Sequence, residues 1–279
     1  MTNLRLAFCL AIFAITLALV VVFERKLIPK LKKRAAQPIF AEGPVWHLSK
    51  SGTPTMGGIA FVPAIALALG SGAVFLYFTG DENGAISILL ILIFCLLNAL
   101  IGIVDDMAKI RKKDNAGLSP IEKLLLQLGA ATLFIILRRV LLLTSTDVHF
   151  TFGTLRLGIF YYPLTLLMLT GTVNSANLTD GIDGIASGVA FAIGGVFAYF
   201  SAGSDTAVSI ASFCLMGIAV GFLIFNIHPA KIFMGDTGSL LLGAVAASMA
   251  VTLGNPFIIL FVGGVYLAEA VSVILQVAY

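Results

Sequence analysis

The sequence predicts an all-α fold, a polytopic transmembrane helical bundle of about nine spans with a short external β-hairpin. Of the 279 residues, 59% are hydrophobic and 11% are charged, and the mean hydropathy is +1.06. Soluble domains carry about 25% charged residues, so most of this surface must meet lipid. A spanning helix uses about 20 apolar residues, which leaves no room for a soluble domain. We therefore expect residues 1–279 to form a single transmembrane domain.

The apolar runs give the spans in order. The first run, Leu4–Phe23, is followed by its basic residues, whereas a secretory signal carries its positive charge in front. It is therefore expected to be a retained span with a cytoplasmic C-terminal end. The further runs are Gly57–Phe78, Ala85–Val104, Lys123–Leu143, Ile159–Val173, Gly188–Phe200, Ala207–Phe225, Ser239–Thr252 and Phe257–Tyr279.

The segment Asp147–Leu157 interrupts these runs on the external side. It alternates apolar residues such as Val148 and Phe150 with polar ones and contains Gly153, a pattern typical of a short hairpin.

The distribution of basic residues fixes the orientation. Alternate threading of the spans puts 13 Lys and Arg on the cytoplasmic side and leaves 4 on the other, in agreement with the positive-inside rule. The cytoplasmic set is Arg25, Lys26, Lys30, Lys32, Lys33, Arg34, Lys50, Lys109, Arg111, Lys112, Lys113, Lys123 and Lys231.

Four polar segments fall at cytoplasmic helix ends in this topology. They are Lys50–Gly58, Asp105–Asp114, Asn174–Asp183 and Asn226–Ser239. Their convergence is what an active site built from helix ends requires.

The segment Asn174–Asp183 carries two amides and two carboxylates. Asp180 and Asp183 share a face if the segment is helical, and Asn174 and Asn177 repeat that spacing with donors and acceptors for a sugar, base or phosphate. The alternative is a polar cap at two helix ends, although capping rarely needs all four groups.

Adjacent carboxylates at Asp105 and Asp106 repel each other near lipid. A divalent cation, or Lys109 four residues after Asp105, would relieve the repulsion. Asp236 stands between glycines just before a span, which suits a Mg²⁺ ligand. The alternatives are solvated aspartates at the first site and an Asp N-cap at the second, with Thr237 or Ser239 also available for capping.

Two segments show helix-start signals. Thr53 before Pro54 predicts an N-cap with proline at the first helical position, and Lys50 beside it would attract phosphate. Ser119 to Glu122 matches a capping box, so Glu122 is assigned a structural role.

Taken together, the four segments resemble the bacterial phospho-N-acetylmuramoyl-pentapeptide transferases (translocase I) of the polyprenyl-phosphate N-acetylhexosamine-1-phosphate transferase superfamily. The matching blocks are KSGTPTMGG at Lys50–Gly58, GIVDD at Gly102–Asp106, NSANLTDGID at Asn174–Asp183 and HPAKIFMGDTGS at His228–Ser239. They occur in the family's order.

The resemblance implies a Mg²⁺-dependent enzyme of the bacterial cytoplasmic membrane, working on its cytoplasmic face. Undecaprenyl phosphate would attack UDP-N-acetylmuramoyl-pentapeptide, giving lipid I and UMP. Asp236 would be the metal ligand, with Asp105 and Asp106 in the same catalytic centre. The substrate pocket would be lined by Lys50, Thr55, Lys109, Asn174, Asn177, Asp180, Asp183, Asn226, Phe233 and Gly235.

Other partners follow from the same resemblance. Membrane lipid is expected around the spans, nucleic acid is not expected, and a homodimer through outer spans is left open. The family's His-rich loop and last span would lie beyond Tyr279.

Two alternatives to this function remain. A sister enzyme transfers N-acetylglucosamine-1-phosphate to the same lipid, but the TPTMGG block argues against it. A transporter with a carboxylate-lined pathway would place its charges near the bilayer midplane, whereas these carboxylates sit at helix ends.

Overall fold

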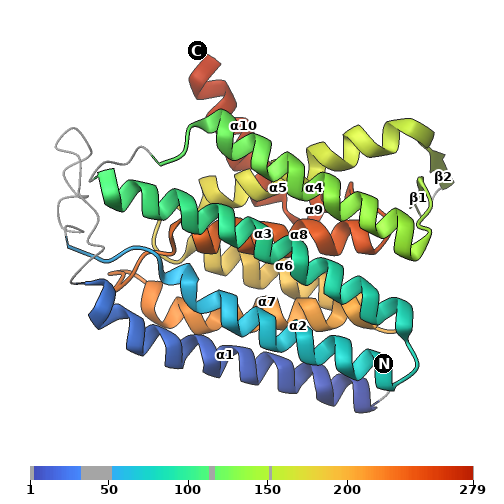
Figure 1. Ribbon diagram of the computed structural model, residues 1–279, viewed down its shortest axis with the longest axis horizontal. Coiled ribbons are helices and arrows are strands. Elements are labelled where there is room, and N and C mark those ends of the chain that lie inside the picture. The colour runs from blue at the N-terminus through green and yellow to red at the C-terminus, as the bar shows by residue number, and fades with distance from the viewer. Residues whose placement is uncertain (1–2, 33–51, 113–116, 151–152, 279) are drawn as a thin grey trace.

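The computed structural model describes residues 3–32, 52–112, 117–150 and 153–278, and most of its helices lie side by side in one bundle (Figure 1). The helices are α1 (Asn3–Leu31), α2 (Phe61–Phe78), α3 (Glu82–Lys112), α4 (Pro120–Leu142), α5 (Tyr161–Thr179), α6 (Ile185–Ser201), α7 (Thr206–Asn226), α8 (Gly235–Thr252), α9 (Ile258–Val262) and α10 (Gly264–Ala278). Short 3-10 turns precede α2 and α5, at η2 (Gly57–Ala60) and η3 (Gly158–Phe160). The all-α prediction is confirmed.

Five of the described helices are long and apolar enough to cross a membrane: α1, α2 with its preceding turn, α3, α4 and α7. Two shorter apolar helices, α6 and α10, accompany them. The chain is therefore a multi-pass membrane protein. The expected number of about nine spans stays a prediction.

The predicted hairpin is confirmed at the end of the bundle where α4 finishes (Figure 1). Strands β1 (Asp147–Phe150) and β2 (Gly153–Arg156) pair in antiparallel fashion, with Asp147 opposite Arg156 and Phe150 opposite Gly153.

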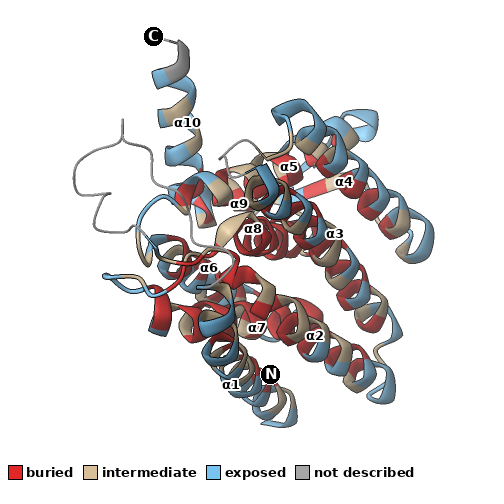
Figure 2. Cartoon of the chain, turned by 60° about the vertical axis from the view of Figure 1, so that its left-hand side comes forward, coloured by how far each residue is buried: buried red, intermediate tan, exposed pale blue. Residues whose placement is uncertain are grey.

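The last apolar run differs from expectation because it is not one continuous helix. It divides into α9 and α10 at Gly263 and Gly264, and α10 leads away from the bundle (Figure 2). Two adjacent glycines are poor helix formers, which accounts for the break.

Helix α8 forms the centre of the bundle. Every residue from Thr237 to Thr252 is buried, as the red colour of α8 shows in Figure 2. The helix packs against α3 and α5. A helix that is apolar all round belongs in a core, and its many small residues let the neighbouring helices approach closely.

The two predicted helix starts have different outcomes. The capping box is confirmed, because the Ser119 hydroxyl accepts from the backbone N–H of Glu122 and the Glu122 carboxylate accepts from Ser119. The N-cap at Thr53 is wrong, because helical structure begins only at Gly57. Pro54 instead pairs with the chain before α8, where its carbonyl accepts from the N–H of Phe233 at 2.8 Å.

This pairing continues along both segments. The N–H of Gly57 donates to the Phe233 carbonyl at 2.9 Å, and the N–H of Gly58 donates to the Met234 carbonyl at 2.8 Å. The residues before α2 are thereby fixed to the residues before α8. The backbone is satisfied by extended pairing rather than by an early helix cap.

Close backbone contacts explain glycines in two of the motifs. A Cβ on Gly102 of α3 would lie 2.5 Å from the carbonyl carbon and oxygen of Asp236. A Cβ on Gly58 would lie 2.1 Å from the backbone nitrogen of Gly238. Only glycine lets α3 and η2 approach the start of α8 this closely.

We expect Gly102→Ala to lower the thermal unfolding temperature, because the added methyl group must push α3 away from α8. Overpacking of this kind costs about 1–3 kcal/mol. Circular dichroism of the detergent-solubilised protein measures the effect. Gly129→Ala on α4 is the control, since no atom lies within 4 Å of its Cβ position. Equal unfolding temperatures for Gly102→Ala and the original chain would contradict the close contact.

Candidate active site

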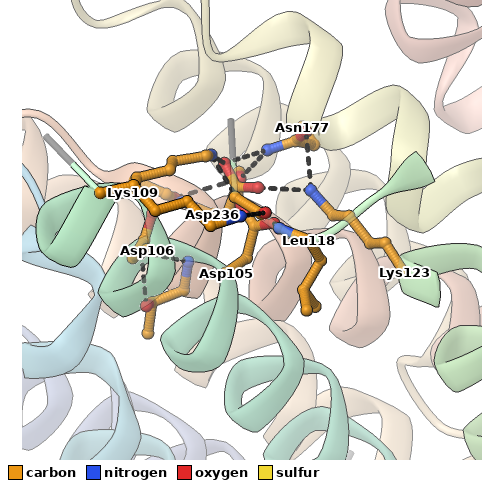
Figure 3. Close-up of polar contacts among 12 residues, drawn as sticks. Asp105, Asp106, Lys109, Leu118, Lys123, Asn177 and Asp236 are labelled. Atoms are coloured by element: carbon orange, nitrogen blue, oxygen red, sulfur yellow. Dashed lines mark hydrogen bonds and ion pairs between the residues drawn. The ribbon is translucent and has the colours of Figure 1, made fainter. Parts of the chain in front are cut away.

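Four helix termini meet at the end of the bundle opposite the hairpin (Figures 1 and 3). The last turns of α3 carry Asp105 and Asp106, and the first turn of α4 carries Lys123. The end of α5 carries Asn177, and the first turn of α8 carries Asp236. The structure thus brings together residues that lie up to 131 positions apart in the chain.

Asp106 caps helix α8 from outside that helix. Its Oδ1 accepts from the backbone N–H of Asp236 at 3.0 Å, and its Oδ2 accepts from the N–H of Thr237 at 3.0 Å. The Thr237 hydroxyl donates to the same Oδ2 at 2.7 Å. The first N–H groups of a helix have no partner within it, and a carboxylate there is also favoured by the helix dipole. The alternative that Asp236, Thr237 or Ser239 caps α8 is therefore wrong, because the cap comes from α3.

Asp236 is surrounded by positive and amide groups. Lys109 Nζ lies 3.1 Å from its Oδ1, and Lys123 Nζ forms an ion pair with its Oδ2. The Nδ2 of Asn177 donates to Oδ1 at 3.1 Å and to the Ser239 hydroxyl at 2.8 Å. These contacts to both oxygens fix the orientation of the Asp236 carboxylate (Figure 3).

Asp105 joins the same network from α3. Its Oδ1 accepts from the N–H of Leu118 at 2.8 Å, and its Oδ2 pairs with Lys109 Nζ at 2.7 Å. Lys109 Nζ thus contacts Asp105 and Asp236 at once, so Lys109, one of the two alternatives expected to relieve the repulsion at Asp105, does pair with it.

The donor set suits a hard divalent cation. Asp105, Asp106 and Asp236 each offer one oxygen within 4.8 Å of the others, and no more than 13% of any of these residues is exposed. Three carboxylates face two ammonium groups, so negative charge remains unbalanced. Because Lys109 already bridges two of the carboxylates, a divalent cation shared by them would compete with its ammonium group.

The Asn174–Asp183 segment is only partly helical. Helix α5 ends at Thr179, so the idea that Asp180 and Asp183 share a helix face is wrong. Asp183 turns toward the chain after α7, where its Oδ2 lies 3.0 Å from His228 Nδ1 and accepts from the N–H of Ala230 at 3.3 Å. Asp183 therefore links the segment between α5 and α6 to the segment after α7.

Asp180 lies just beyond the end of α5 and is half-buried. Loss of hydration, together with the neighbouring carboxylates of Asp236 and Asp106, raises the pKa of Asp180 well above its usual range. A carboxyl group held in this way disfavours its own ionised form.

Several other predicted pocket residues hold the surrounding loops. Asn226 is buried and fully engaged, since its Oδ1 accepts from the N–H of Gly184 and its Nδ2 donates to the Ile232 carbonyl. Asn174 points one turn deeper, where its Nδ2 donates to Gln127 Oε1 at 2.7 Å. Neither side chain contacts the three clustered carboxylates.

The remaining predicted positions flank the carboxylates. Thr55 and Phe233 lie on the paired segments before η2 and α8. Gly235 opens α8 with φ of +72°, beside the carboxylate of Asp106. Lys50 lies outside the described residues.

Sequence reasoning missed Lys123, Thr237 and Ser239 as site residues. The sequence predicts Lys123 as a cytoplasmic charge at the start of a span, and it follows the Ser119 capping box directly. That signal could have placed it at the same membrane level as the carboxylates. The partnership of Thr237 with Asp106 spans 131 positions and leaves no local sequence signal.

We expect Asp180→Asn to raise the unfolding temperature near pH 7.5. The raised pKa of Asp180 in the folded state means that its ionisation opposes folding above its unfolded pKa of about 3.9. The gain should shrink as the pH falls toward that value. Thermal unfolding between pH 4.5 and 8 measures it.

Asp183→Asn is the matched comparison and should lower stability, because Asp183 makes favourable contacts with His228 and Ala230. A stability gain for Asp180→Asn that does not change with pH would contradict the electrostatic explanation.

Comparison with known proteins agrees with this geometry. The glycosyl transferase family 4 model matches residues 88–254, and a signature described as phospho-N-acetylmuramoyl-pentapeptide-transferase signature 1 matches residues 50–62. The first range includes α4, α5 and all three clustered aspartates. The second includes the segment paired with the start of α8.

Relatives that match over most of their length carry the same name as this signature. The chain is 39% identical to the phospho-N-acetylmuramoyl-pentapeptide-transferase of Staphylococcus saprophyticus, over 98% of this chain and 84% of the relative. It is 39% identical to that of Halalkalibacterium halodurans, over 95% and 80%. It is 41% identical to that of a Synechococcus species, over 91% and 72%. Identity at this level across nearly the whole chain, together with both family matches, shows that the chain belongs to the phospho-N-acetylmuramoyl-pentapeptide transferase family.

Proposed function

We propose that this chain transfers phospho-N-acetylmuramoyl-pentapeptide from its UDP-sugar to undecaprenyl phosphate, forming lipid I and releasing UMP in peptidoglycan biosynthesis. One observation carries the proposal. Pro54, Gly57 and Gly58 of the signature segment are hydrogen-bonded to Phe233 and Met234, which lead into Asp236. The family signature and the carboxylates therefore form one continuous site.

The residues fit a bound Mg²⁺ ion. Carboxylate oxygens are ligands that Mg²⁺ prefers, and Asp105, Asp106 and Asp236 supply them from buried positions. Asp236 is the leading ligand, because Asp106 is largely engaged in capping α8. A bound Mg²⁺ ion would neutralise charge on the transferred phosphate.

The lysines serve the nucleotide substrate. Lys109 and Lys123 converge on Asp236 from α3 and α4, so their ammonium groups can turn toward phosphate oxygens brought beside it. Asn177 keeps Asp236 in place from α5. Positive charges held beside the transferred phosphate would stabilise the negative charge of the transition state.

The attacking lipid phosphate needs little help from a base. A phosphate monoester has a second pKa near 6, so it is largely dianionic at pH 7. The carboxylates then serve to position charge and to orient the nucleophile. A covalent aspartyl-phosphate is the competing route, and trapping a phospho-enzyme from nucleotide substrate without lipid would overturn direct attack.

The site is proposed to face the cytoplasm of the bacterial inner membrane. Lys30 in the last turn of α1 and the basic residues Lys109, Arg111 and Lys112 in the last turn of α3 lie at the same end of the bundle as the carboxylates (Figure 1). This location also favours a transferase over a transporter, since the clustered charges sit at helix termini rather than midway along the helices.

The decisive experiment measures UMP release from the purified chain in detergent. UDP-N-acetylmuramoyl-pentapeptide and UDP-N-acetylglucosamine are each supplied with undecaprenyl phosphate, with and without Mg²⁺. We expect release only from the first, only with Mg²⁺, and at least about a hundredfold less from Asp236→Asn. Release from UDP-N-acetylglucosamine alone would favour the sister enzyme, and no Mg²⁺-dependent release from either would contradict the proposal.

We expect Lys109→Met to change divalent binding and nucleotide binding in opposite directions. Loss of the ammonium group that bridges Asp105 and Asp236 removes a competing cation, so Mn²⁺ should bind several-fold more tightly without substrate. The same change should weaken UMP binding, because a phosphate partner is lost. Electron paramagnetic resonance follows the Mn²⁺, and calorimetry follows the UMP.

Arg111→Met is the control for this experiment, because it removes one positive charge from an exposed position on the same helix. Weaker Mn²⁺ binding by Lys109→Met than by the control would show that Lys109 supports the cation rather than competing with it.

A further inference from the structure

A second polar site lies at the opposite end of the bundle, near the hairpin. Arg138 sits on α4, 15 residues after Lys123 and therefore about 22 Å farther along the helix. Only 6% of Arg138 is exposed. A buried charge inside a membrane protein is costly, and such residues usually have a functional partner.

The positive charge of Arg138 is only partly satisfied. Its Nη1 donates to the Thr252 hydroxyl at 3.1 Å, and its guanidinium carbon lies 5.8 Å from the centre of the Phe134 ring. Thr252 is the last residue of α8, so the negative end of that helix dipole offers some compensation. Within the described ranges, no carboxylate forms an ion pair with Arg138, although the carboxylate of Asp205 acts on its charge from beyond ion-pair distance. A guanidinium group has five N–H donors, and most of them remain available.

Arg138 lines a pocket whose polar groups suit an anion. Arg139, three consecutive hydroxyl residues (Thr144, Ser145 and Thr146) and Tyr161 contribute to the same wall, and none of the described lining residues is acidic. The enclosed part of the pocket is small, about 10 Å³, and the rest is open to its surroundings. A group that meets Arg138 must therefore be presented from the open side.

The surroundings of the pocket indicate a lipid-borne ligand. Val140, Leu143, Ile159 and Phe160 flank it in the chain and are each at least 64% exposed, as expected for side chains that face acyl chains. Tyr161 and Tyr162 line the pocket itself, and tyrosine gathers at the level of lipid headgroups. Lipid can therefore present a headgroup directly to Arg138.

We propose that this pocket binds the phosphate group of an anionic phospholipid. Guanidinium and hydroxyl donors hold phosphate oxygens through charge-assisted hydrogen bonds. The bound headgroup would connect the end of α4 with the start of α5 and the end of α8. These three helices also carry Lys123, Asn177 and Asp236 at their other ends, so the lipid stabilises the bundle that holds the carboxylates. The inference does not depend on the reaction proposed above.

The test uses the purified full chain in a neutral detergent. Phosphatidylglycerol, phosphatidylcholine and inorganic phosphate are titrated separately, thermal unfolding is recorded, and native mass spectrometry counts retained lipids. We expect phosphatidylglycerol to raise the unfolding temperature and to remain bound, with little effect from the other two. Arg138→Gln should weaken this binding about tenfold or more.

Arg156→Gln is the matched control, since it removes one positive charge from the exposed strand β2 at the same end. It should bind phosphatidylglycerol like the original chain. The double variant Thr144→Val with Thr146→Val keeps Arg138 and should also weaken binding, which protects the test if Arg138→Gln folds poorly. An unchanged affinity in the double variant and in folded Arg138→Gln would overturn the site. Equal protection by inorganic phosphate would overturn its assignment to a lipid.

Discussion

The carboxylate of Asp106 at the start of α8 is the contact on which the rest of the site depends. It accepts from two consecutive backbone N–H groups and from the Thr237 hydroxyl. Helix α8 is buried from Thr237 onward, so water cannot satisfy the backbone N–H group of Thr237. A single side chain from α3 therefore caps the N-terminus of the central helix and also fixes Asp236 beside Asp105.

This contact is possible only because the backbones approach closely. Gly102 allows α3 to touch the chain at Asp236, and the segment before η2 pairs with Phe233 and Met234 on another side. The start of α8 is thus held by α3 and by an extended segment at once. Lys109 and Lys123 then balance part of the resulting negative charge. The described part of the KSGTPTMGG motif, the GIVDD motif and the GDTGS part of the last motif therefore belong to one contact region.

Much of this arrangement could be predicted from sequence. Hydropathy predicted the helical bundle, and the alternation at Asp147–Leu157 predicted the hairpin. The distribution of basic residues predicted that the polar segments lie at one end. Local rules also identified the capping box at Ser119, because all of its partners lie within three residues.

The failures have a common physical cause. The cap expected at Thr53 was replaced by pairing with Phe233, a partner far away in the chain. The cap of α8 came from Asp106 rather than from its own first turn. The ion-pair partner of Lys123 and the hydrogen-bond partner of Arg138 lie on another helix, α8, so the local sequence around either residue does not reveal these contacts. Local patterns can locate polar groups, but tertiary contacts decide which of them meet.

The burial of α8 also limits how a membrane-bound molecule can reach Asp236. From Thr237 onward the helix has no side that meets lipid, because α3, α5 and α7 pack against it. An acyl or prenyl chain must therefore remain on the outside of those helices, and only a polar end group can extend past them to the first turn of α8. The bundle thereby separates the part of a lipid that anchors it from the part that reacts.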